Sequence, residues 1–144
     1  AIPNNNPIIV AMTGASGAVL GYQTIQSLID QKVNVIFVCS SAARMVWKDE
    51  NLPPFGETVE KWENTSLFKM YPNNDFYSPI ASGTFKTNGM IIVPTSMNTI
   101  AAISNGISDN LIKRAADVDW RAAINPTANK PLNQTACLSI KLIM

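Results

Sequence analysis

Three short polar segments of the chain carry residue types that can bind an anion or a polar ligand. Gly14 to Ala18 contains two glycines around Ser16, and Ser40-Ser41 and Pro94 to Thr99 are rich in hydroxyls. Backbone N–H groups of a glycine-containing segment at a helix start can approach an anion, with the Ser16 hydroxyl as a further donor. The same segment also fits an ordinary strand-to-helix turn with Ser16 as its N-cap. The segment alone leaves both interpretations open.

The third segment and two charged residues add to this candidate chemistry. Pro94 to Thr99 combines several hydroxyls and an amide with Met97, which suits a polar, planar ligand. Capping of a helix by Asn98 or Thr99 would explain one of these residues but not the whole cluster. Arg114 lies among apolar residues and is either a phosphate ligand or a surface arginine. Glu50 ends a predicted helix, where a carboxylate is unfavourable to the helix dipole.

The amino-acid composition argues against several classes of function. The chain has no histidine, so a Ser–His pair is impossible, a favoured metal ligand is missing, and no metal site is expected. Its net charge of +1 argues against nucleic-acid binding. Only 15% of the residues are charged, which favours a homo-oligomer, although a surface rich in Asn, Ser and Thr would also explain this value.

The elements that must position these segments alternate along the first half of the chain. Apolar runs predict strands over 7–12, 33–39 and 89–94, and helical spacing predicts helices over 18–30, from 41 onward and over 99–105. A short helix is possible within 57–68, and Ser108 or Asp109 should cap another helix. The alternation indicates an α/β protein with a mostly parallel sheet. The three polar segments then follow the carboxyl ends of strands, where such sheets bind ligands.

The 144 residues are expected to form a single domain without internal repeats. The pattern weakens after Val118, so 119–144 is an atypical part in which only 137–144 could supply another strand or helix. No apolar run approaches the length of a membrane span, and the N-terminus does not resemble a signal peptide. With only two cysteines, we expect a cytoplasmic protein.

Four motifs in order resemble the flavin prenyltransferases of the UbiX type, long described as aromatic-acid decarboxylases: 12–18 (MTGASGA), 81–90 (ASGTFKTNGM), 94–99 (PTSMNT) and 109–118 (DNLIKRAADV). The resemblance implies a three-layer α/β/α, flavodoxin-like fold that binds FMN. It also implies transfer of a dimethylallyl group from dimethylallyl phosphate to N5 and C6 of reduced FMN. The prenylated FMN would serve a partner decarboxylase, and the assembly would be a homo-oligomer of trimers, up to a dodecamer.

The resemblance assigns roles to particular residues. Glu50 and Ser16 would be catalytic, with Glu50 handling a proton during ring closure, and Arg121 would hold the substrate phosphate. The implied FMN contacts are Gly14, Ala15, Ser16, Ser40, Ser96, Met97, Asn98, Thr99 and Arg114. These residues lie in the three polar segments and at the arginine selected above on chemical grounds.

The sequence departs from the family pattern near its end. Ala128-Asn129 stand where the family has Arg-Glu, and the family's C-terminal segment with a tyrosine and an arginine for the allyl phosphate has no counterpart in the 144 residues. These departures keep open the alternative of a non-catalytic FMN-binding or carrier subunit of an aromatic-acid decarboxylase system. The related peptidyl-cysteine decarboxylases rely on an active-site histidine and are therefore not favoured.

Overall fold

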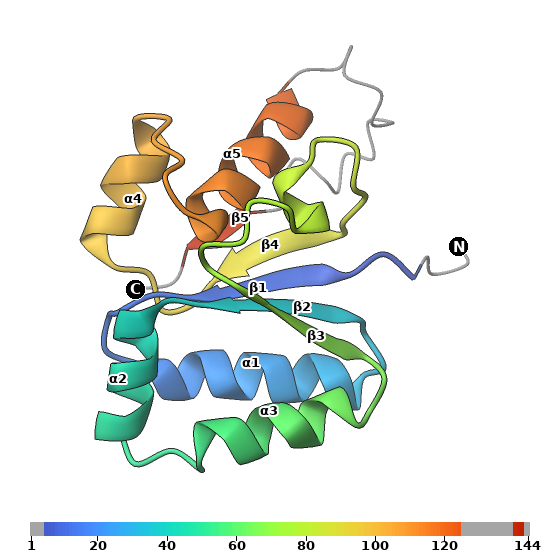
Figure 1. Ribbon diagram of the computed structural model, residues 1–144, viewed down its shortest axis with the longest axis vertical. Coiled ribbons are helices and arrows are strands. Elements are labelled where there is room, and N and C mark those ends of the chain that lie inside the picture. Colours follow the sequence, from blue (N-terminus) through green and yellow to red (C-terminus); the bar gives the residue numbers. More distant parts are fainter. Residues whose placement is uncertain (1–4, 125–139, 143–144) are drawn as a thin grey trace.

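A five-stranded parallel sheet forms the centre of the molecule (Figure 1). The computed structural model describes residues 5–124 and 140–142. The strands are β1 (Ile8–Met12), β2 (Val35–Cys39), β3 (Phe68–Pro72), β4 (Gly89–Ile92) and β5 (Ile140–Leu142). Their order is β3-β2-β1-β4-β5, so the chain moves outward from β1 to β3 and then crosses back to β4 on the other side of β1. The carboxyl ends of β1 and β4 therefore form the switch point at which open sheets bind ligands.

Helices cover both faces of the sheet, as the predicted three-layer α/β/α fold requires (Figure 1). One face carries α1 (Ala18–Asp30), α2 (Ser41–Asp49) and α3 (Phe55–Glu63). The other carries the 3-10 turn η1 (Pro79–Ala81) and α5 (Leu111–Ile124), with α4 (Met97–Ser104) packed beside α5. The predicted fold class is confirmed.

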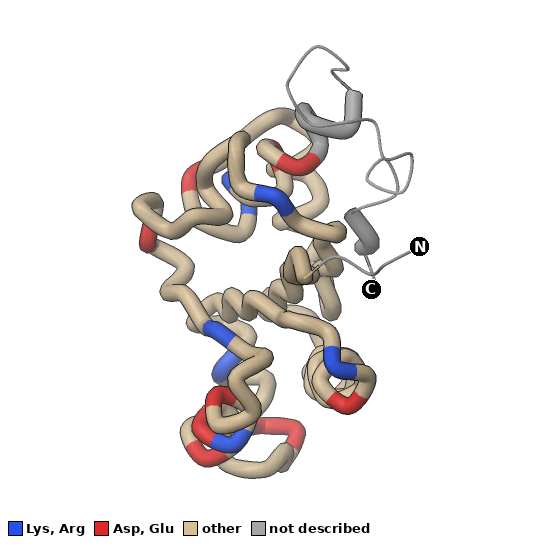
Figure 2. Tube along the Cα trace, turned by 90° about the vertical axis from the view of Figure 1, so that its right-hand side faces the viewer, with Lys and Arg blue, Asp and Glu red and all other residues tan. Residues whose placement is uncertain are grey.

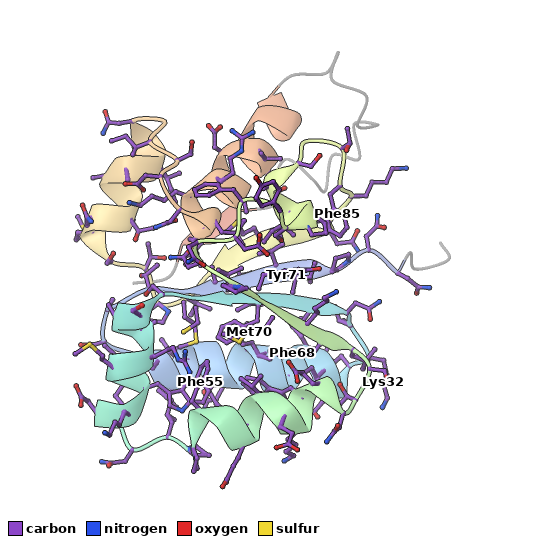
Figure 3. The ribbon with its side chains drawn as sticks, viewed as in Figure 1. Lys32, Phe55, Phe68, Met70, Tyr71 and Phe85 are labelled. Atoms are coloured by element: carbon purple, nitrogen blue, oxygen red, sulfur yellow. The ribbon has the colours of Figure 1, made fainter. Side chains whose placement is uncertain are left out.

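Successive side chains along each strand point alternately toward the two helix layers. Val10 and Met12 face α1, whereas Ile9 and Ala11 face α5, and all four are fully buried. The same alternation places Met70 of β3 on the α1 face and Tyr71 on the α5 face (Figure 3). Burial on both faces explains why β1 and β2 are almost wholly apolar.

Charged side chains are confined to the helices, the loops and the outer strands. Figure 2 shows the central strands as uncharged, and β1, β2 and β4 contain no Lys, Arg, Asp or Glu. Among the residues that the structure describes, no helix is both long and apolar enough to cross a lipid bilayer.

Most predicted elements are confirmed, and several predicted boundaries are wrong. The helix expected within 57–68 is α3, which ends at Glu63, so Phe68 begins β3, a strand that the sequence analysis did not predict. Helix α4 begins at Met97 after the N-cap Ser96, not at Thr99. Helix α5 is capped by Asn110, whose Oδ1 accepts a hydrogen bond from Lys113 N, rather than by Ser108 or Asp109. It continues past Val118 to Ile124, and the 137–144 segment supplies β5.

Candidate functional site

A hollow of about 270 Å³ lies at the carboxyl ends of the strands, and we call it the strand-end cleft. Residues from five different loops or helix starts line it, since the segments that follow β1, β2, β3 and β4 and the start of α5 all converge there. The lining residues are Thr13, Gly14, Ser40, Ala42, Asn73, Ser96, Asn98, Thr99, Asn110, Ile112 and Lys113. The cleft therefore lies at the switch point of the sheet.

The start of α1 is capped by a side chain from another helix. Gly17 is its N-cap, with a φ of 101° that favours glycine, and no side chain of its own segment caps it. Instead, Gly17 N donates to Glu50 Oε1 at 2.7 Å and Val19 N donates to Glu50 Oε2 at 3.2 Å. Glu50 was expected to be unfavourable at the end of α2, yet its carboxylate lies at the positive end of α1, where it is stabilising. Ser16 is exposed and is not the N-cap.

Ser40 and Gly14 bring the starts of α2 and α1 together. The Ser40 hydroxyl caps α2 by accepting a hydrogen bond from Ala43 N at 3.1 Å. A Cβ atom on Gly14 would lie 2.6 Å from the Ala42 Cβ, well inside van der Waals contact. Only glycine at position 14 permits this close approach of the β1 loop to α2.

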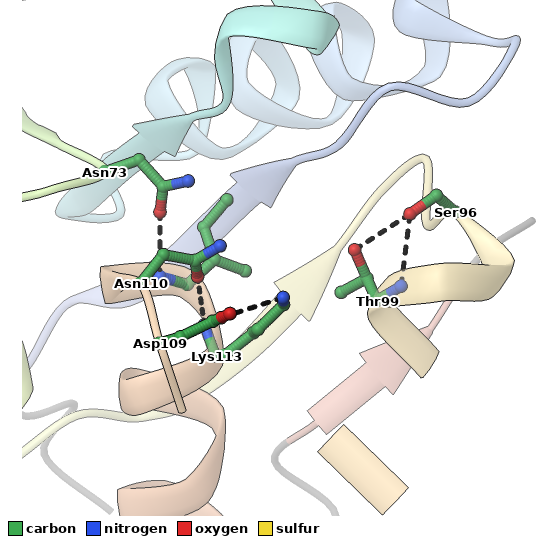
Figure 4. Close-up of polar contacts among 7 residues, drawn as sticks. Asn73, Ser96, Thr99, Asp109, Asn110 and Lys113 are labelled. Atoms are coloured by element: carbon green, nitrogen blue, oxygen red, sulfur yellow. Dashed lines mark hydrogen bonds and ion pairs between the residues drawn. The ribbon is translucent and has the colours of Figure 1, made fainter. Parts of the chain in front are cut away.

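Thr13 fixes the loop after β1 to the loop after β4. It is 5% exposed, and its hydroxyl donates to Pro94 O at 2.9 Å and accepts from Ser96 N at 2.7 Å. The Ser96 hydroxyl in turn accepts from Thr99 N at 3.2 Å and pairs with the Thr99 hydroxyl at 2.8 Å (Figure 4). The sequence analysis did not select Thr13, although it directly follows the first buried strand.

Three further cleft residues were also missed. Asn73 follows the unpredicted strand β3, and Asn110 and Lys113 belong to the first turn of α5. Asn73 accepts hydrogen bonds from Ile112 N through its Oδ1, at 3.0 Å, and from Leu111 N through its carbonyl, at 2.8 Å (Figure 4). The sequence signal for this contact is the cluster of turn-forming residues at 71–75.

Five of the predicted site residues line the cleft: Gly14, Ser40, Ser96, Asn98 and Thr99. Ala15, Ser16 and Met97 are their chain neighbours but do not line it, and Met97 is 64% exposed. The exposed Arg114 is not a lining residue either, because its Nε donates to Ala81 O at 3.2 Å. The side chain of Arg121, in the last part of α5, lies outside the described residues.

The donor groups of the cleft suit an anionic, oxygen-rich ligand. The starts of α2, α4 and α5 line it, and the backbone N–H groups of Ser41 and Ala42 on α2 and of Met97 and Asn98 on α4 have no acceptor among the described residues. Hydroxyls, amides and one lysine supply the remaining polar groups. Free N–H groups at helix starts are typical phosphate ligands. Within 5–119, no cluster of acidic or cysteine side chains could hold a metal ion.

A second hollow, of about 500 Å³, lies between α2 and the start of α3. It is lined by Arg44, Trp47, Lys48, Asn51, Leu52, Pro54 and Phe55. Arg44 stacks on the Phe55 ring, 4.4 Å from its centroid, the start of α3 is the single helix start among the lining residues, and none of these residues carries a hydroxyl. Although it is the larger hollow, it lacks the converging N–H groups and hydroxyls of the strand-end cleft, which is therefore the candidate site.

Comparisons with known proteins agree with this geometry. A model of the flavoprotein family matches residues 2–136. The flavin prenyltransferase UbiX of Archaeoglobus fulgidus is 40% identical over 110 residues, which cover 76% of this chain and 58% of that protein. A probable UbiX-like flavin prenyltransferase of Bacillus subtilis is 37% identical over 130 residues, which cover 88% of this chain and 61% of that protein. The chain thus spans about three fifths of the length of these relatives.

Solved structures give the same similarity. AnUbiX (PadA1), crystallised in complex with FMN and dimethylallyl pyrophosphate, superposes with a TM-score of 0.77 at 30% identity, covering 98% of this chain and 78% of that one. A dodecameric FMN-dependent UbiX-like decarboxylase from Escherichia coli O157:H7 has a TM-score of 0.71 at 35% identity, covering 81% of this chain and 60% of that one.

Proposed function

This chain belongs to the flavoprotein family, on its UbiX-type branch, and we propose that it binds FMN in the strand-end cleft and transfers to it a dimethylallyl group. The observation that carries the proposal is the convergence of two helix starts with free N–H groups on one cleft at the switch point of the sheet. Its relatives named flavin prenyltransferase support the reaction class.

The residues of the cleft fit the parts of FMN by their chemistry. The free N–H groups of α2 and α4, with the hydroxyls of Ser40 and Ser96, would bind the phosphate. The amides of Asn73, Asn98 and Asn110 offer both donors and acceptors to the polar edge of a ring system or to a sugar alcohol. Gly14, Ala15 and Ser16 present backbone close to this site. When bound in its reduced form, FMN would supply the nucleophilic N5 and C6 atoms that accept the dimethylallyl group.

We assign the proton transfer of ring closure to Glu50, whose side chain does not itself line the strand-end cleft. It lies beside the loop that contains Ser16, because its two oxygens bind Gly17 N and Val19 N. These N–H groups fix the direction of the carboxylate, so it needs little reorganisation during the reaction. Carboxylates are among the groups that can transfer protons in a chain without histidine, together with lysine, tyrosine and hydroxyls. In this proposal Ser16 and Glu50 are catalytic, and Arg121 is a ligand of the substrate phosphate.

The assembly, the partner protein and the cellular compartment are proposed by similarity to the same relatives. The UbiX-like decarboxylase of Escherichia coli is dodecameric, and we propose a homo-oligomer here too. Prenylated FMN would pass to a separate partner decarboxylase, and we place the reaction in the cytoplasm. The alternative is a non-catalytic FMN-binding subunit, which Ala128-Asn129 favour because they replace an Arg-Glu pair.

An anaerobic incubation tests the proposal. The protein is mixed with reduced FMN and dimethylallyl phosphate, and the released flavin is identified by mass spectrometry. Prenylated FMN is expected, and Glu50→Gln should bind FMN but form product more slowly. Bound but unmodified FMN would favour the FMN-binding subunit, whereas no flavin binding at all would refute both functions.

A further inference from the structure

Lys113 is the only positively charged side chain that lines the strand-end cleft among the described residues. It lies in the first turn of α5, and its side chain is 11% exposed. Figure 4 shows it extending from α5 toward the Ser96–Thr99 turn at the start of α4. Its Nζ donates to Asp109 Oδ1 at 2.9 Å, and the Asp109 side chain is 67% exposed. A largely buried lysine side chain is thus paired, through an exposed contact, with a carboxylate that faces solvent.

The backbone N–H groups at the start of α5 are not available to bind an anion in the cleft. The N–H groups of Leu111 and Ile112 donate to Asn73, and those of Lys113 and Arg114 donate to Asn110. All four N–H groups of the first turn are therefore satisfied by the protein. The start of α1 is similarly occupied, since Gly17 N and Val19 N bind the Glu50 carboxylate. Among the helix starts that line the cleft, those of α2 and α4 keep N–H groups without an acceptor among the described residues, and these groups carry only partial charges.

Arg114 does not compensate for this shortage of charge. Its Nε binds the Ala81 carbonyl, the residue is exposed, and it does not line the cleft. A phosphate monoester with up to two negative charges, placed between α2 and α4, would have Lys113 as the only full positive charge on the described walls.

We propose that Lys113 is the cationic ligand of the FMN phosphate, and that Asp109 holds its ammonium group until the phosphate takes the place of the carboxylate. The inference rests on the proposed function, since it assigns a ligand within the same cleft. The exchange needs little energy, because an exposed ion pair contributes little on its own. A phosphate flanked by helix N–H groups would form a charge-assisted hydrogen bond to Nζ in a less exposed place. Lys113 would thus distinguish FMN from riboflavin, which lacks the phosphate.

The test compares the dissociation constants of FMN and riboflavin, measured by quenching of flavin fluorescence. Lys113→Gln should weaken FMN binding about tenfold and leave riboflavin binding unchanged, so that the preference for FMN falls by the same factor. Lys61→Gln is the matched control, because it removes one exposed lysine from α3, outside the cleft, and should change neither constant. Asp109→Asn should strengthen FMN binding, since it releases Lys113 from its partner.

Four outcomes would overturn the assignment. Unchanged FMN binding by Lys113→Gln would show that Nζ does not contact the phosphate. Equal weakening of FMN and riboflavin would assign Lys113 to the ring or to the shape of the cleft. A loss of FMN preference in Arg114→Gln but not in Lys113→Gln would identify the arginine as the phosphate ligand. Failure of the unaltered protein to bind either flavin would instead refute the proposed function, and with it this inference.

Discussion

At the scale of single residues, the contribution of Glu50 to the start of α1 can be separated from the proton transfer that we propose for it. Its carboxylate bonds to Gly17 N and Val19 N satisfy two donors at the start of α1 and complement the helix dipole. Glu50→Gln keeps one acceptor oxygen, but it places an amide N–H group against one of these backbone donors and removes the charge. We therefore expect the free energy of unfolding to fall by about 1 kcal/mol, as for the loss of an N-cap.

Urea denaturation of the two proteins without flavin measures this change. Glu60→Gln is the control, because Glu60 is exposed in the middle of α3 and the same amide replaces its carboxylate. Equal stability of Glu50→Gln and the unaltered protein would show that the carboxylate contributes nothing to α1. Any loss of product formation in Glu50→Gln could then be assigned to proton transfer alone.

Cys39 is a buried thiol that we expect to be unreactive in the folded protein. Burial raises its pKa from 9.0 to about 12, against the smaller lowering effect of the Arg44 charge. Because the thiolate is the nucleophile, Cys39 should react with iodoacetamide at pH 8 much more slowly than in urea-unfolded protein. Mass spectrometry of the peptide that contains Cys39 measures both rates. Equal rates would contradict the expectation.

The same shift predicts how stability depends on pH. Above pH 9 the unfolded protein loses the thiol proton while the folded protein keeps it, so the folded state binds more protons. Cys39 therefore stabilises the protein fully below pH 9, and this contribution falls as pH rises toward 12. Cys39→Ala should show a shallower loss of stability over that range in denaturation experiments.

At the scale of elements, the contact between the β1 loop and α2 shapes the cleft. Gly14 does not have a positive φ, so alanine there meets no backbone penalty and only the 2.6 Å contact with the Ala42 Cβ opposes it. Gly14→Ala should destabilise the protein by about 1–3 kcal/mol through overpacking, and it should weaken flavin binding by moving α2.

The double variant Gly14→Ala/Ala42→Gly tests whether this contact is the cause. Removing the Ala42 Cβ takes away the atom that clashes, so the double variant should be more stable than Gly14→Ala despite the cost of a glycine near a helix start. Thermal unfolding of the four proteins of the cycle gives the coupling energy. Strict additivity would mean that Ala42 does not limit the residue at position 14.

The strands that could be predicted from the sequence are those that are buried on both faces and therefore consist almost wholly of apolar residues. The apolar runs before Gly14, Ser40 and Pro94 predicted β1, β2 and β4, since each is buried on both faces. Strand β3 was missed because it lies at the edge of the sheet and contains Lys69 and Pro72, which lower strand propensity.

The missed site residues follow from the missed strand. Asn73 was not recognised because its place at the carboxyl edge depends on β3, and Asn110 and Lys113 depend on how α5 packs against that loop. Ser40 and Ser96 could be predicted because hydroxyls directly after a buried strand and before a helix have few other positions. The Glu50 contact with α1 joins residues 33 positions apart, and no local pattern encodes it.

At the scale of the whole molecule, the low charge predicts an assembly. Only 15% of the residues are charged, and the cores of subunit interfaces are depleted in charge. Large apolar side chains are also exposed, among them Leu20 at 41% and Met97 at 64%. We therefore expect light scattering to give a mass that is a multiple of 15.6 kDa, with a trimer, or a dodecamer built from trimers, as the specific expectation.

The exposed apolar side chains make the assembly testable by substitution. Val19 and Leu20 lie in the first turn of α1, next to the Glu50 contact, and Met97 begins α4. Met97→Glu would place a charge on an exposed apolar side chain that does not line the cleft. The variant should dissociate to smaller species, which light scattering detects. A monomeric mass for the unaltered protein would instead assign its low charge to a polar, uncharged surface, and a flavin site formed by one copy alone would then have to account for any activity.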